Sequence, residues 1–418
     1  MSLLSVDEAR ERLLSQLKPV GTEKVPLTAC NGRVLARDIT AAEDLPLFDN
    51  SSMDGFAIQA ADTANAAPAS RVTLSVVADI PAGSTPTISL AHKQAARIMT
   101  GAPMPAGADA VIPVEDTDFN DRSPGIPAPR TISIEKIVKH GDNVRRRGTD
   151  VRAGDIVLKQ GQVLRPQDIG LLAMLGFPEL DVYKMPLVAL LSSGDELLEA
   201  GAPLESGKIR DSNSYMLASL IESAGAEVLR LGIARDTRAS VQGLIEQAVL
   251  LDADLILSSA GVSVGAFDFV KDVVESNGSL NFWRVNMRPG KPLAFGEYRE
   301  IPFVGLPGNP VSAFVGFEVF VRGAIGRLGG VSDGDRSQSR AEPGRSVRVR
   351  CVEEILSDGR ESYLRAVVHE EDGQLVAKLT GHQGSGNLLS LVQANALLII
   401  PAGVKCVPAG QELNAWLF

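Results

Sequence analysis

In the segment from Pro186 onward, short apolar runs alternate with stretches that have the apolar period of a helix. The runs LVALLSS, AEVLRLGIA, ADLILSS and PFVGLP predict strands that are buried on both faces. Between them, stretches such as SNSYMLASLIESAG, TRASVQGLIEQAVLL and FDFVKDVVESNG predict helices. Continuous apolar strands that alternate with helices are typical of a parallel, doubly wound α/β sheet, and this is the fold we predict here.

The rest of the chain shows mainly β patterns. The N-terminal residues predict an amphipathic helix, opened by a capping box of Ser5 and Glu8, and then a short strand. Residues from about 41 to 140 contain short β-like runs such as RVTLSVVADI and ARIMTGAPM, which predict a small β domain. From about residue 335, β runs return with predicted hairpin turns at Asp358-Gly359 and Asp372-Gly373, which indicates a C-terminal β domain.

Composition and charge argue against several classes of protein. The 418-residue chain has a net charge of −10 and a pI of about 5.1, which argues against a general nucleic-acid binder because such proteins present a basic face. Its three cysteines, Cys30, Cys351 and Cys406, form no CxxC pair and its four histidines are dispersed, so neither a disulfide framework nor a structural zinc site is indicated. Without a run of about 20 apolar residues or a signal-peptide core, we expect a cytoplasmic protein that does not span a membrane.

Polar residues follow four of the predicted α/β strands. Asp195 and Glu196 come after LVALLSS, Asp236 after AEVLRLGIA, Asp268 at the end of AGVSVGAFD, and Asn309 after PFVGLP. Ligands of open α/β sheets bind outside the carboxyl ends of the strands, so we expect these side chains to converge on one crevice, although ordinary caps and turns have a similar composition. Dispersed acids near cations favour Mg²⁺-assisted phosphoanhydride chemistry, because Mg²⁺ binds through one or two carboxylates plus ligand oxygens.

Two segments concentrate positive charge. In NFWRVNMRPGKP, Arg284 and Arg288 occupy the polar positions of an alternating pattern, which predicts one strand with both arginines on one face, about 13 Å apart. Lys291 follows just beyond. In GDNVRRRGTD, Arg145 begins a run of three arginines ahead of Asp150. These groups suit the binding of a polyanion, and a solvated surface would show much the same pattern.

A third segment, LPLFDNSSMDGFAI, places small polar residues and two aspartates between apolar ends. Turn chemistry explains Asn, Asp, Ser and Gly in such a place. A calcium-binding EF-hand loop does not fit, because its twelfth position falls on Ala61 instead of a carboxylate. The residue pattern alone leaves the role of Asp54 in this segment open.

Eight motifs together resemble a known family. They are, in chain order, FDNSSMDGFA, MTGAPMPAGADAVIPVED, RRRGTD, SSGDEL, SSAGVSVGAFD, RPGKP, GLPGNPVSA and GHQGS. The chain is similar over essentially its whole length to the molybdopterin molybdenumtransferases, the family of the bacterial MoeA protein and the gephyrin E domain.

The resemblance implies a fold of four domains. These are a split linking domain (1–40 and 152–180), an inserted β domain (41–151), an α/β molybdopterin-binding domain (181–334) and a C-terminal β domain (335–418). It also implies a homodimer whose active sites are shared between subunits, and a transient contact with the molybdopterin adenylyltransferase. The implied reaction inserts molybdenum from molybdate into adenylylated molybdopterin, with Mg²⁺-dependent release of AMP, and yields the molybdenum cofactor.

The matching motifs also imply the site residues. The implied catalytic acids are Asp54, Asp150, Glu196, Asp236 and Asp268, of which the last three would hold the metal. Arg284 and Arg288 stand where relatives commonly have lysine, which keeps the charge but replaces a compact ammonium with a planar fork. Ala260 replaces a common glycine, which predicts a less open turn. The implied substrate-binding residues are Thr100, Arg145, Ser193, Gly194, Ser263, Arg284, Arg288, Lys291, Pro307, Asn309 and Ser385.

Three other functions share parts of this pattern. A molybdopterin adenylyltransferase would use a similar α/β site, but the related adenylating domain has no additional β domains. A non-enzymatic scaffold of the gephyrin type would not need the acids, and the chain has nothing that resembles a receptor-tethering extension. A molybdate-storage protein would bind the anion without consuming a nucleotide-linked pterin.

Overall fold

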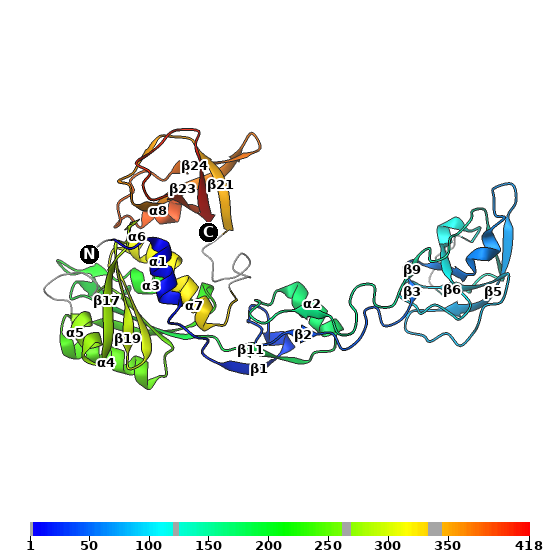
Figure 1. Ribbon diagram of the computed structural model, residues 1–418, viewed down its shortest axis with the longest axis horizontal. Helices are drawn as coiled ribbons and strands as arrows, with labels where there is room; N and C mark the ends of the chain where they lie inside the picture. Colours follow the sequence, from blue (N-terminus) through cyan, green and yellow to red (C-terminus); the bar gives the residue numbers. More distant parts are fainter. Residues whose placement is uncertain (1–2, 120–124, 261–268, 333–344) are drawn as a thin grey trace. The chain divides into compact units, whose positions relative to one another are not determined.

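The computed structural model describes residues 3–119, 125–260, 269–332 and 345–418. The chain divides into two compact units (Figure 1): residues 38–158 form one, and residues 1–37 with 159–418 form the other. We call them the inserted unit and the main unit. Within the described ranges, no helix is long and apolar enough to cross a membrane.

The main unit contains a six-stranded sheet in the order β15-β12-β16-β20-β19-β17. Its strands are β12 (Leu187–Ser193), β15 (Glu227–Ala234), β16 (Leu255–Ser259), β17 (Gly278–Arg284), β19 (Pro292–Tyr298) and β20 (Ile301–Leu306). The first four strands in the sheet order are parallel, as predicted, whereas β19 and β17 run antiparallel to their neighbours. The strand–helix alternation did not reveal these two, because no helix separates them along the chain.

Helices cover both faces of this sheet, so the doubly wound α/β prediction is confirmed. One face carries α1 (Val6–Leu14), α3 (Asn213–Ser223), α6 (Pro310–Gly316), the π-helical turn η4 (Phe317–Val321) and α7 (Arg322–Leu328); the other carries α4 (Arg238–Leu250) and α5 (Phe269–Ser276). Successive strand residues point to opposite faces, so Val188 and Leu190 join the first core while Ala189 and Leu191 join the second. This double burial explains why the strands read as unbroken apolar runs.

Two segments far apart in the sequence lie side by side next to the α/β sheet (Figure 1). Strand β1 (Thr22–Pro26) pairs with β11 (Glu179–Tyr183), and single bridges join Leu35 to Val182 and Val34 to Val163. The same region contains the 3-10 turn η1 (Leu27–Ala29) and helix α2 (Pro166–Met174).

The C-terminal residues of the main unit form a second sheet in the order β18-β23-β24-β21-β27-β25, closed by pairing of β23 with β25. Its elements are β18 (Met287–Arg288), β21 (Arg345–Cys351), β23 (Glu361–Glu371), β24 (Gln374–Leu379), α8 (Leu389–Gln393), β25 (Ala396–Ile400) and β27 (Glu412–Leu417). The predicted Asp372-Gly373 turn joins β23 to β24, and both residues have the positive φ of a tight hairpin. The prediction of a hairpin at Asp358-Gly359 is wrong, because β22 (Ile355–Leu356) pairs with β26 (Cys406–Val407) and not with β23.

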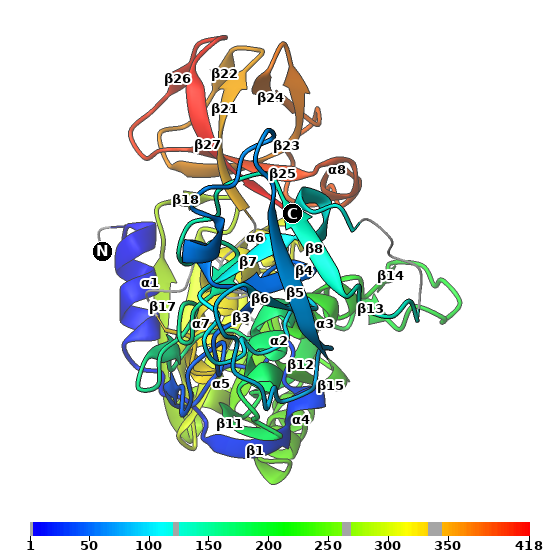
Figure 2. The ribbon, with the colours of Figure 1, turned by 90° about the vertical axis from the view of Figure 1, so that its right-hand side faces the viewer.

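The inserted unit is a β structure. Its five-stranded sheet has the order β7-β4-β6-β5-β8, with the labels visible in Figure 2. The strands are β4 (Gly55–Ile58), β5 (Val72–Ile80), β6 (Gln94–Ile98), β7 (Ala110–Pro113) and β8 (Thr131–Ile134). Two short pairs flank it: β2 (Ile39–Thr40) with β10 (Ile156–Leu158), and β3 (Asn50–Ser51) with β9 (Val144–Arg145). The strands predicted from RVTLSVVADI and ARIMTGAPM are therefore present.

Gly55 is required where β4 enters this sheet. A Cβ atom at this position would lie 2.1 Å from the carbonyl oxygen of Ile112 on the neighbouring strand. We expect Gly55→Ala to destabilise the protein by about 2–3 kcal/mol, because backbone cannot move aside as a flexible side chain can. Calorimetry should show a lower midpoint of thermal unfolding. Gly170→Ala, in helix α2 with open space around the new methyl, should leave the midpoint unchanged or raise it.

Candidate active site

The first part of the candidate site lies at the carboxyl ends of β12 and β15, which are parallel neighbours. The Asp195 N–H donates to Asp236 Oδ2 at 3.3 Å, and the Asp236 N–H donates to Asp195 Oδ1 at 3.3 Å. The Ser193 hydroxyl lies 3.5 Å from Asp236 Oδ1. The crossed bonds hold two carboxylates at one sheet edge, as expected from the strand ends.

Glu196 lies at the same edge and folds back over Gly194. A Cβ on Gly194 would lie 2.5–2.9 Å from the atoms of the Glu196 carboxylate, so this glycine leaves the space the carboxylate occupies. The structure thus brings the predicted residues Ser193, Gly194, Glu196 and Asp236 to adjacent strand ends. Asp268 and Ser263 lie outside the described residues. Over the rest of the chain no three His, Cys, Asp or Glu side chains form a metal-binding group.

Asn213, the first residue of α3, was missed by the sequence analysis. Its buried side-chain amide donates to Ser259 Oγ at 2.9 Å and to the Gly308 carbonyl oxygen at 2.7 Å. These bonds tie the start of α3 to the end of β16 and to the loop that carries Pro307 and Asn309. In the sequence Asn213 resembled an ordinary helix cap, which explains why its cross-strand role was not seen.

Ala260 follows β16 with φ of 82°, a left-handed conformation that is unfavourable for any residue with a Cβ. The Cβ of Ala260 would also lie 3.4 Å from a Cβ added at Gly308. Ala260 is therefore a strained residue beside the Asn213 contacts, and the less open turn stays a prediction because the residues that follow lie outside the described ranges.

The predicted single strand through the cationic segment NFWRVNMRPGKP is wrong. Strand β17 ends at Arg284, the chain forms a bridge from Val285 to Leu4, and β18 then joins the C-terminal sheet. Val285 and Met287 are fully buried, so the alternation was real, but it spans two sheets. A continuous row with a spacing of about 13 Å therefore does not describe Arg284 and Arg288. Lys291 lies next to Val285, because the Val285 N–H donates to the Lys291 carbonyl oxygen at 2.9 Å.

Arg365, in the middle of β23, is fully buried and was also missed. Its Nε donates to Ser390 Oγ at 3.0 Å and its Nη2 to the Gly384 carbonyl oxygen at 3.0 Å. Its Nη1 is buried with no hydrogen-bond partner among the described residues. Burial, and then the positive charge of Arg288, lower its pKa to about 10. A buried guanidinium with an unused donor, which also experiences the positive charge of a second guanidinium, has the features of an anion site.

Ser385, which the resemblance implied, belongs to the loop that holds Arg365. The Gly384 carbonyl accepts from Arg365, and the Ser385 carbonyl accepts from the Val311 N–H of α6 at 3.1 Å. The GHQGS loop therefore joins the buried guanidinium to the first turn of α6. A signal for Arg365 was present in the sequence: it interrupts the apolar run YLRAVV, where a charged residue is rarely buried without a specific partner.

In the inserted unit, Asp54 lies in the turn between β3 and β4. Its Oδ1 accepts from both the backbone N–H and the hydroxyl of Thr100, each at 2.8 Å. On the other side of β3, Arg145 pairs with Asn50 across the β3–β9 ladder and forms an ion pair with Asp150. The four predicted residues of this unit therefore form two pairs about one short strand.

The other two arginines of the RRRGTD motif bind nearby acids. Arg146 pairs with Asp49 at 2.7 Å and Arg147 with Asp44 at 2.5 Å. The Arg147 N–H and then Arg146 hold the pKa of Asp49 below its usual value. These ion pairs join the segment before β3 to the RRRGTD loop.

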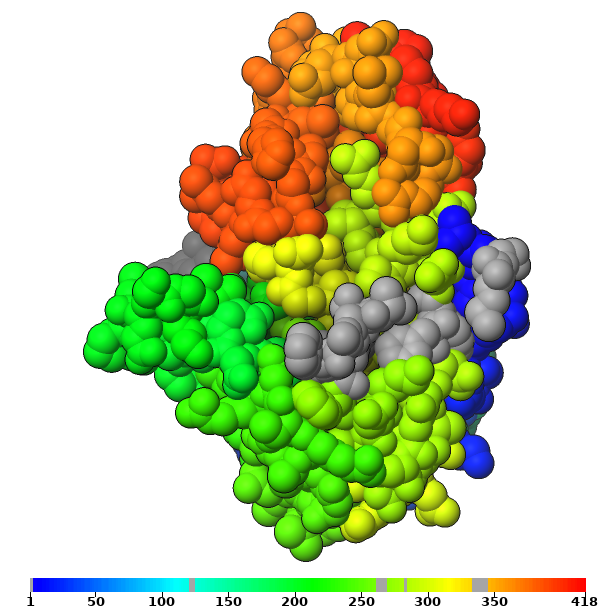
Figure 3. All heavy atoms as spheres, turned by 90° about the vertical axis from the view of Figure 1, so that its left-hand side faces the viewer, coloured from blue at the N-terminus to red at the C-terminus, as the bar shows by residue number. Residues whose placement is uncertain are grey.

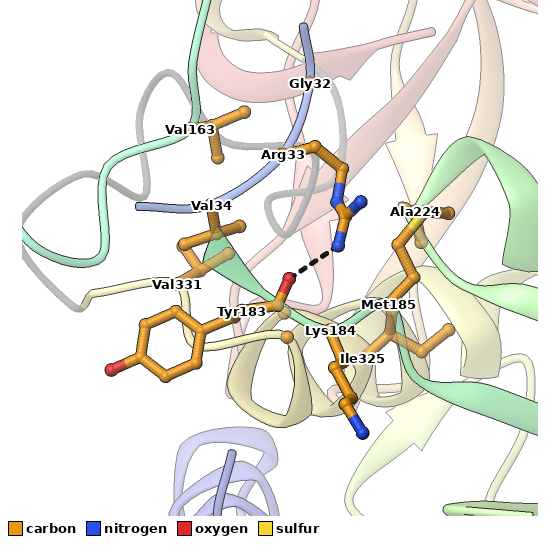
Figure 4. Close-up of a pocket in the computed structure, with 13 residues that line it drawn as sticks. Gly32, Arg33, Val34, Val163, Tyr183, Lys184, Met185, Ala224, Ile325 and Val331 are labelled. Carbon is orange, nitrogen blue, oxygen red and sulfur yellow. Dashed lines mark hydrogen bonds between the residues drawn. The ribbon is translucent and has the colours of Figure 1, made fainter. Parts of the chain in front are cut away.

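A cavity elsewhere in the main unit is not a candidate for the reaction. Figure 4 shows it between the β1–β11 region and the ends of α3 and α7, with the Arg33 guanidinium donating to the Tyr183 carbonyl oxygen at 2.8 Å. Its volume is about 30 Å³ and no acid lines it. Such a cavity admits water but not a nucleotide-sized ligand.

Three family models match the chain. They are described as the MoeA N-terminal region (domain I and II), a probable molybdopterin binding domain, and the MoeA C-terminal region (domain IV), and they match residues 4–176, 189–327 and 348–418. A crystal structure of the molybdopterin biosynthesis moeA protein from Pyrococcus horikoshii OT3 is 30% identical with a TM-score of 0.83, and covers 100% of both chains. This agreement confirms the multidomain α/β and β fold.

Curated relatives match over the same length. Molybdopterin molybdenumtransferase 2 of Mycobacterium tuberculosis (strain H37Rv) is 39% identical over 418 residues, which is 99% of each chain. The molybdopterin molybdenumtransferase of Haemophilus influenzae is 38% identical over 414 residues, which is 99% of this chain and 98% of the relative. The chain therefore belongs to the MoeA family of molybdopterin molybdenumtransferases.

Proposed function

We propose that this protein inserts molybdenum from molybdate into adenylylated molybdopterin, releases AMP and so forms the molybdenum cofactor. The observation that carries the proposal at residue level is Arg365, whose buried Nη1 donor has no hydrogen-bond partner in the described chain. Molybdate is a tetrahedral dianion, and guanidinium groups bind such oxyanions through charge-assisted hydrogen bonds. An oxyanion here would supply the missing acceptor.

Arg288 would provide the second cation of the molybdate site. Its charge acts on Arg365, and repulsion between the two guanidinium groups would be relieved by a dianion between them. Lys291 and the Ser385 hydroxyl, implied by the family motifs, are further donors on the adjoining loops. Because water is excluded from Arg365, its hydrogen bonds to the anion would be stronger than those of a surface arginine.

The acids at the ends of β12 and β15 fit Mg²⁺. Their donors are hard carboxylate oxygens, and Mg²⁺ needs only one or two such groups when the ligand supplies other oxygens. Glu196 and Asp236 would hold the ion, with Asp268 as a further predicted ligand. Bound there, it would neutralise charge on the two phosphate groups of the phosphoanhydride that is cleaved when AMP is released.

Asp54 and Thr100 would come to this site from the second subunit of a homodimer. Three exposed apolar side chains in the segment that carries Asp54 support this part of the proposal: Leu47, Phe48 and Met53 are 51%, 43% and 38% exposed. Such a group of exposed apolar residues around a polar turn is typical of a surface that docks on another protein. The three cysteines are all free, and a cytoplasmic location belongs to the same proposal.

The reaction can be tested with purified protein, adenylylated molybdopterin, Mg²⁺ and molybdate, following AMP by chromatography. We expect AMP to appear only when molybdate is present. A parallel incubation with ATP and molybdopterin should give no adenylylated product. Molybdate-independent AMP release, or adenylylation from ATP, would contradict the proposal and favour the adenylyltransferase.

A further inference from the structure

Arg288 lies on a strand that depends on the C-terminal domain. Strand β18 pairs in parallel with β23, with Met287 opposite Glu361 and Arg288 opposite Ser362. Figure 3 shows this side of the main unit, with the C-terminal domain in orange and red and the α/β domain in green and yellow. The position of Arg288 therefore depends on how β23 begins.

Arg360 connects the turn before β23 to the strand that carries Arg288. Its Nε and Nη2 donate to Asp358 Oδ2 at 3.0 and 2.5 Å, and its Nη1 donates to the Met287 carbonyl oxygen at 3.2 Å. The Arg360 backbone N–H also donates to Asp358 Oδ1 at 3.1 Å. One planar guanidinium thus bonds a carboxylate and the carbonyl just before Arg288, a geometry that a guanidinium favours.

The charges of Arg365 and Asp358 influence the orientation of the Arg288 side chain. Its side chain makes no hydrogen bond or ion pair with any described residue, so only longer-range forces and packing orient it. The positive charge of Arg365 repels it. Asp358 attracts it: hydrogen bonds from Arg360 are the main reason that the pKa of Asp358 is low, and the charge of Arg288 adds a smaller effect. Arg360 donates to both Asp358 oxygens, and among the described residues no hydrogen bond joins Arg288 to Asp358, so the N–H donors of Arg288 are available.

We infer that Asp358 and Arg360 are positioning residues, which hold Arg288 beside Arg365 so that both guanidinium groups bind one molybdate. Neither residue contacts the anion in this arrangement; they act through Arg288. The inference rests on the proposed function of Arg288 and Arg365. It predicts that neutralising either member of the ion pair weakens molybdate binding, although the two charges are opposite.

Because Asp358 and Arg360 carry opposite charges, two variants distinguish positioning from a simple electrostatic effect. Simple electrostatics predicts that Asp358→Asn tightens anion binding, because a negative charge is removed, and that Arg360→Met weakens it. Positioning predicts that both weaken it, by about threefold for Asp358→Asn and about tenfold for Arg360→Met. The dissociation constant for molybdate alone is measured by equilibrium dialysis of the full-length protein, with molybdenum counted by mass spectrometry. Tighter or unchanged binding by Asp358→Asn overturns the inference.

A double-mutant cycle separates positioning from general disruption. In an Arg288→Ala background, Arg360→Met should have no further effect on molybdate binding, because the group it positions is gone. In turnover, Arg360→Met should raise KM for molybdate and leave kcat and KM for adenylylated molybdopterin nearly unchanged. An equal loss in both backgrounds contradicts the inference.

Arg348→Met is the matched control, since it removes an arginine from an exposed ion pair with Glu412 in the same domain. It should leave molybdate binding unchanged. If Arg288→Ala binds molybdate normally, the proposed role of Arg288 in the oxyanion site is wrong. Weak binding by Arg288→Ala with normal binding by Arg360→Met and Asp358→Asn would overturn only the positioning role.

Discussion

Arg365→Met will lower kcat/KM for molybdate by about a hundredfold or more. The variant removes a buried donor that has no acceptor in the described chain, together with one of the two charges of the proposed oxyanion site. Direct binding of molybdate should fall in parallel. The measurements are molybdate-dependent AMP release and equilibrium dialysis.

The stability of Arg365→Met distinguishes a binding role from a structural one. Methionine fills much of the same space and removes the free energy needed to bury a charge, so replacement of a buried ion by an apolar side chain is often neutral or stabilising. Loss of the bonds to Ser390 and Gly384 opposes this gain. We expect the midpoint of thermal unfolding to change by only a few degrees. Arg350→Met, on β21 of the same C-terminal sheet, is a control for the loss of a partly buried arginine and should bind molybdate normally. Normal molybdate binding by Arg365→Met would contradict the proposed oxyanion site.

Asp54→Asn will reduce molybdate-dependent AMP release by about a hundredfold or more while the protein folds normally and keeps the oligomeric state of the wild type. The Asn carbonyl oxygen can still accept both hydrogen bonds from Thr100, so the turn keeps its geometry and loses only the negative charge. Turnover, thermal unfolding and sedimentation are compared with wild type. Asp79→Asn, which removes a carboxylate from an ion pair with Arg97 in the same unit, should leave turnover unchanged.

Mixing two inactive variants tests whether the site is shared between subunits. If Asp54 of one subunit completes the site of the other, hybrid dimers of Asp54→Asn and Glu196→Gln contain one intact site, and random mixing should restore about a quarter of wild-type activity. No recovery after verified exchange of subunits would show that Asp54 does not act across the dimer. Full activity of the Asp54→Asn variant by itself would show that the Asp54 carboxylate has no role in the reaction.

The fold of the α/β region was predictable because its signal is local. Burial on both faces of a strand imposes an apolar run, and burial on one face of a helix imposes a period near 3.6. Val188 to Leu191 alternate between two cores, yet every one of them is apolar. The directions of β17 and β19 were not predictable in this way, because strand direction depends on the connection and on pairing rather than on the residues themselves.

The acids at the strand ends were predictable for the same reason that the sheet was. Once β12 and β15 are parallel neighbours, Asp195 and Asp236 must lie at one edge, and the structure joins them by two crossed hydrogen bonds. Arg365 and Asn213 were different. Their importance comes from partners on other strands and loops, such as Gly384 and Gly308, that lie far from them in the chain.

By itself, then, the sequence determined where helices and strands occur, which of them are buried, and which end of each parallel strand carries charge. Those properties depend on side-chain periodicity and on backbone direction within a few residues. Only the tertiary structure decided that β18 leaves one sheet for another, that Arg360 reaches the backbone before Arg288, and that Arg365 is buried with an unused donor. The first two features arise from pairing between segments more than 70 residues apart, as between Met287 and Arg360, and Arg365 is held by a loop beyond the next strand. No local pattern encodes contacts of either kind.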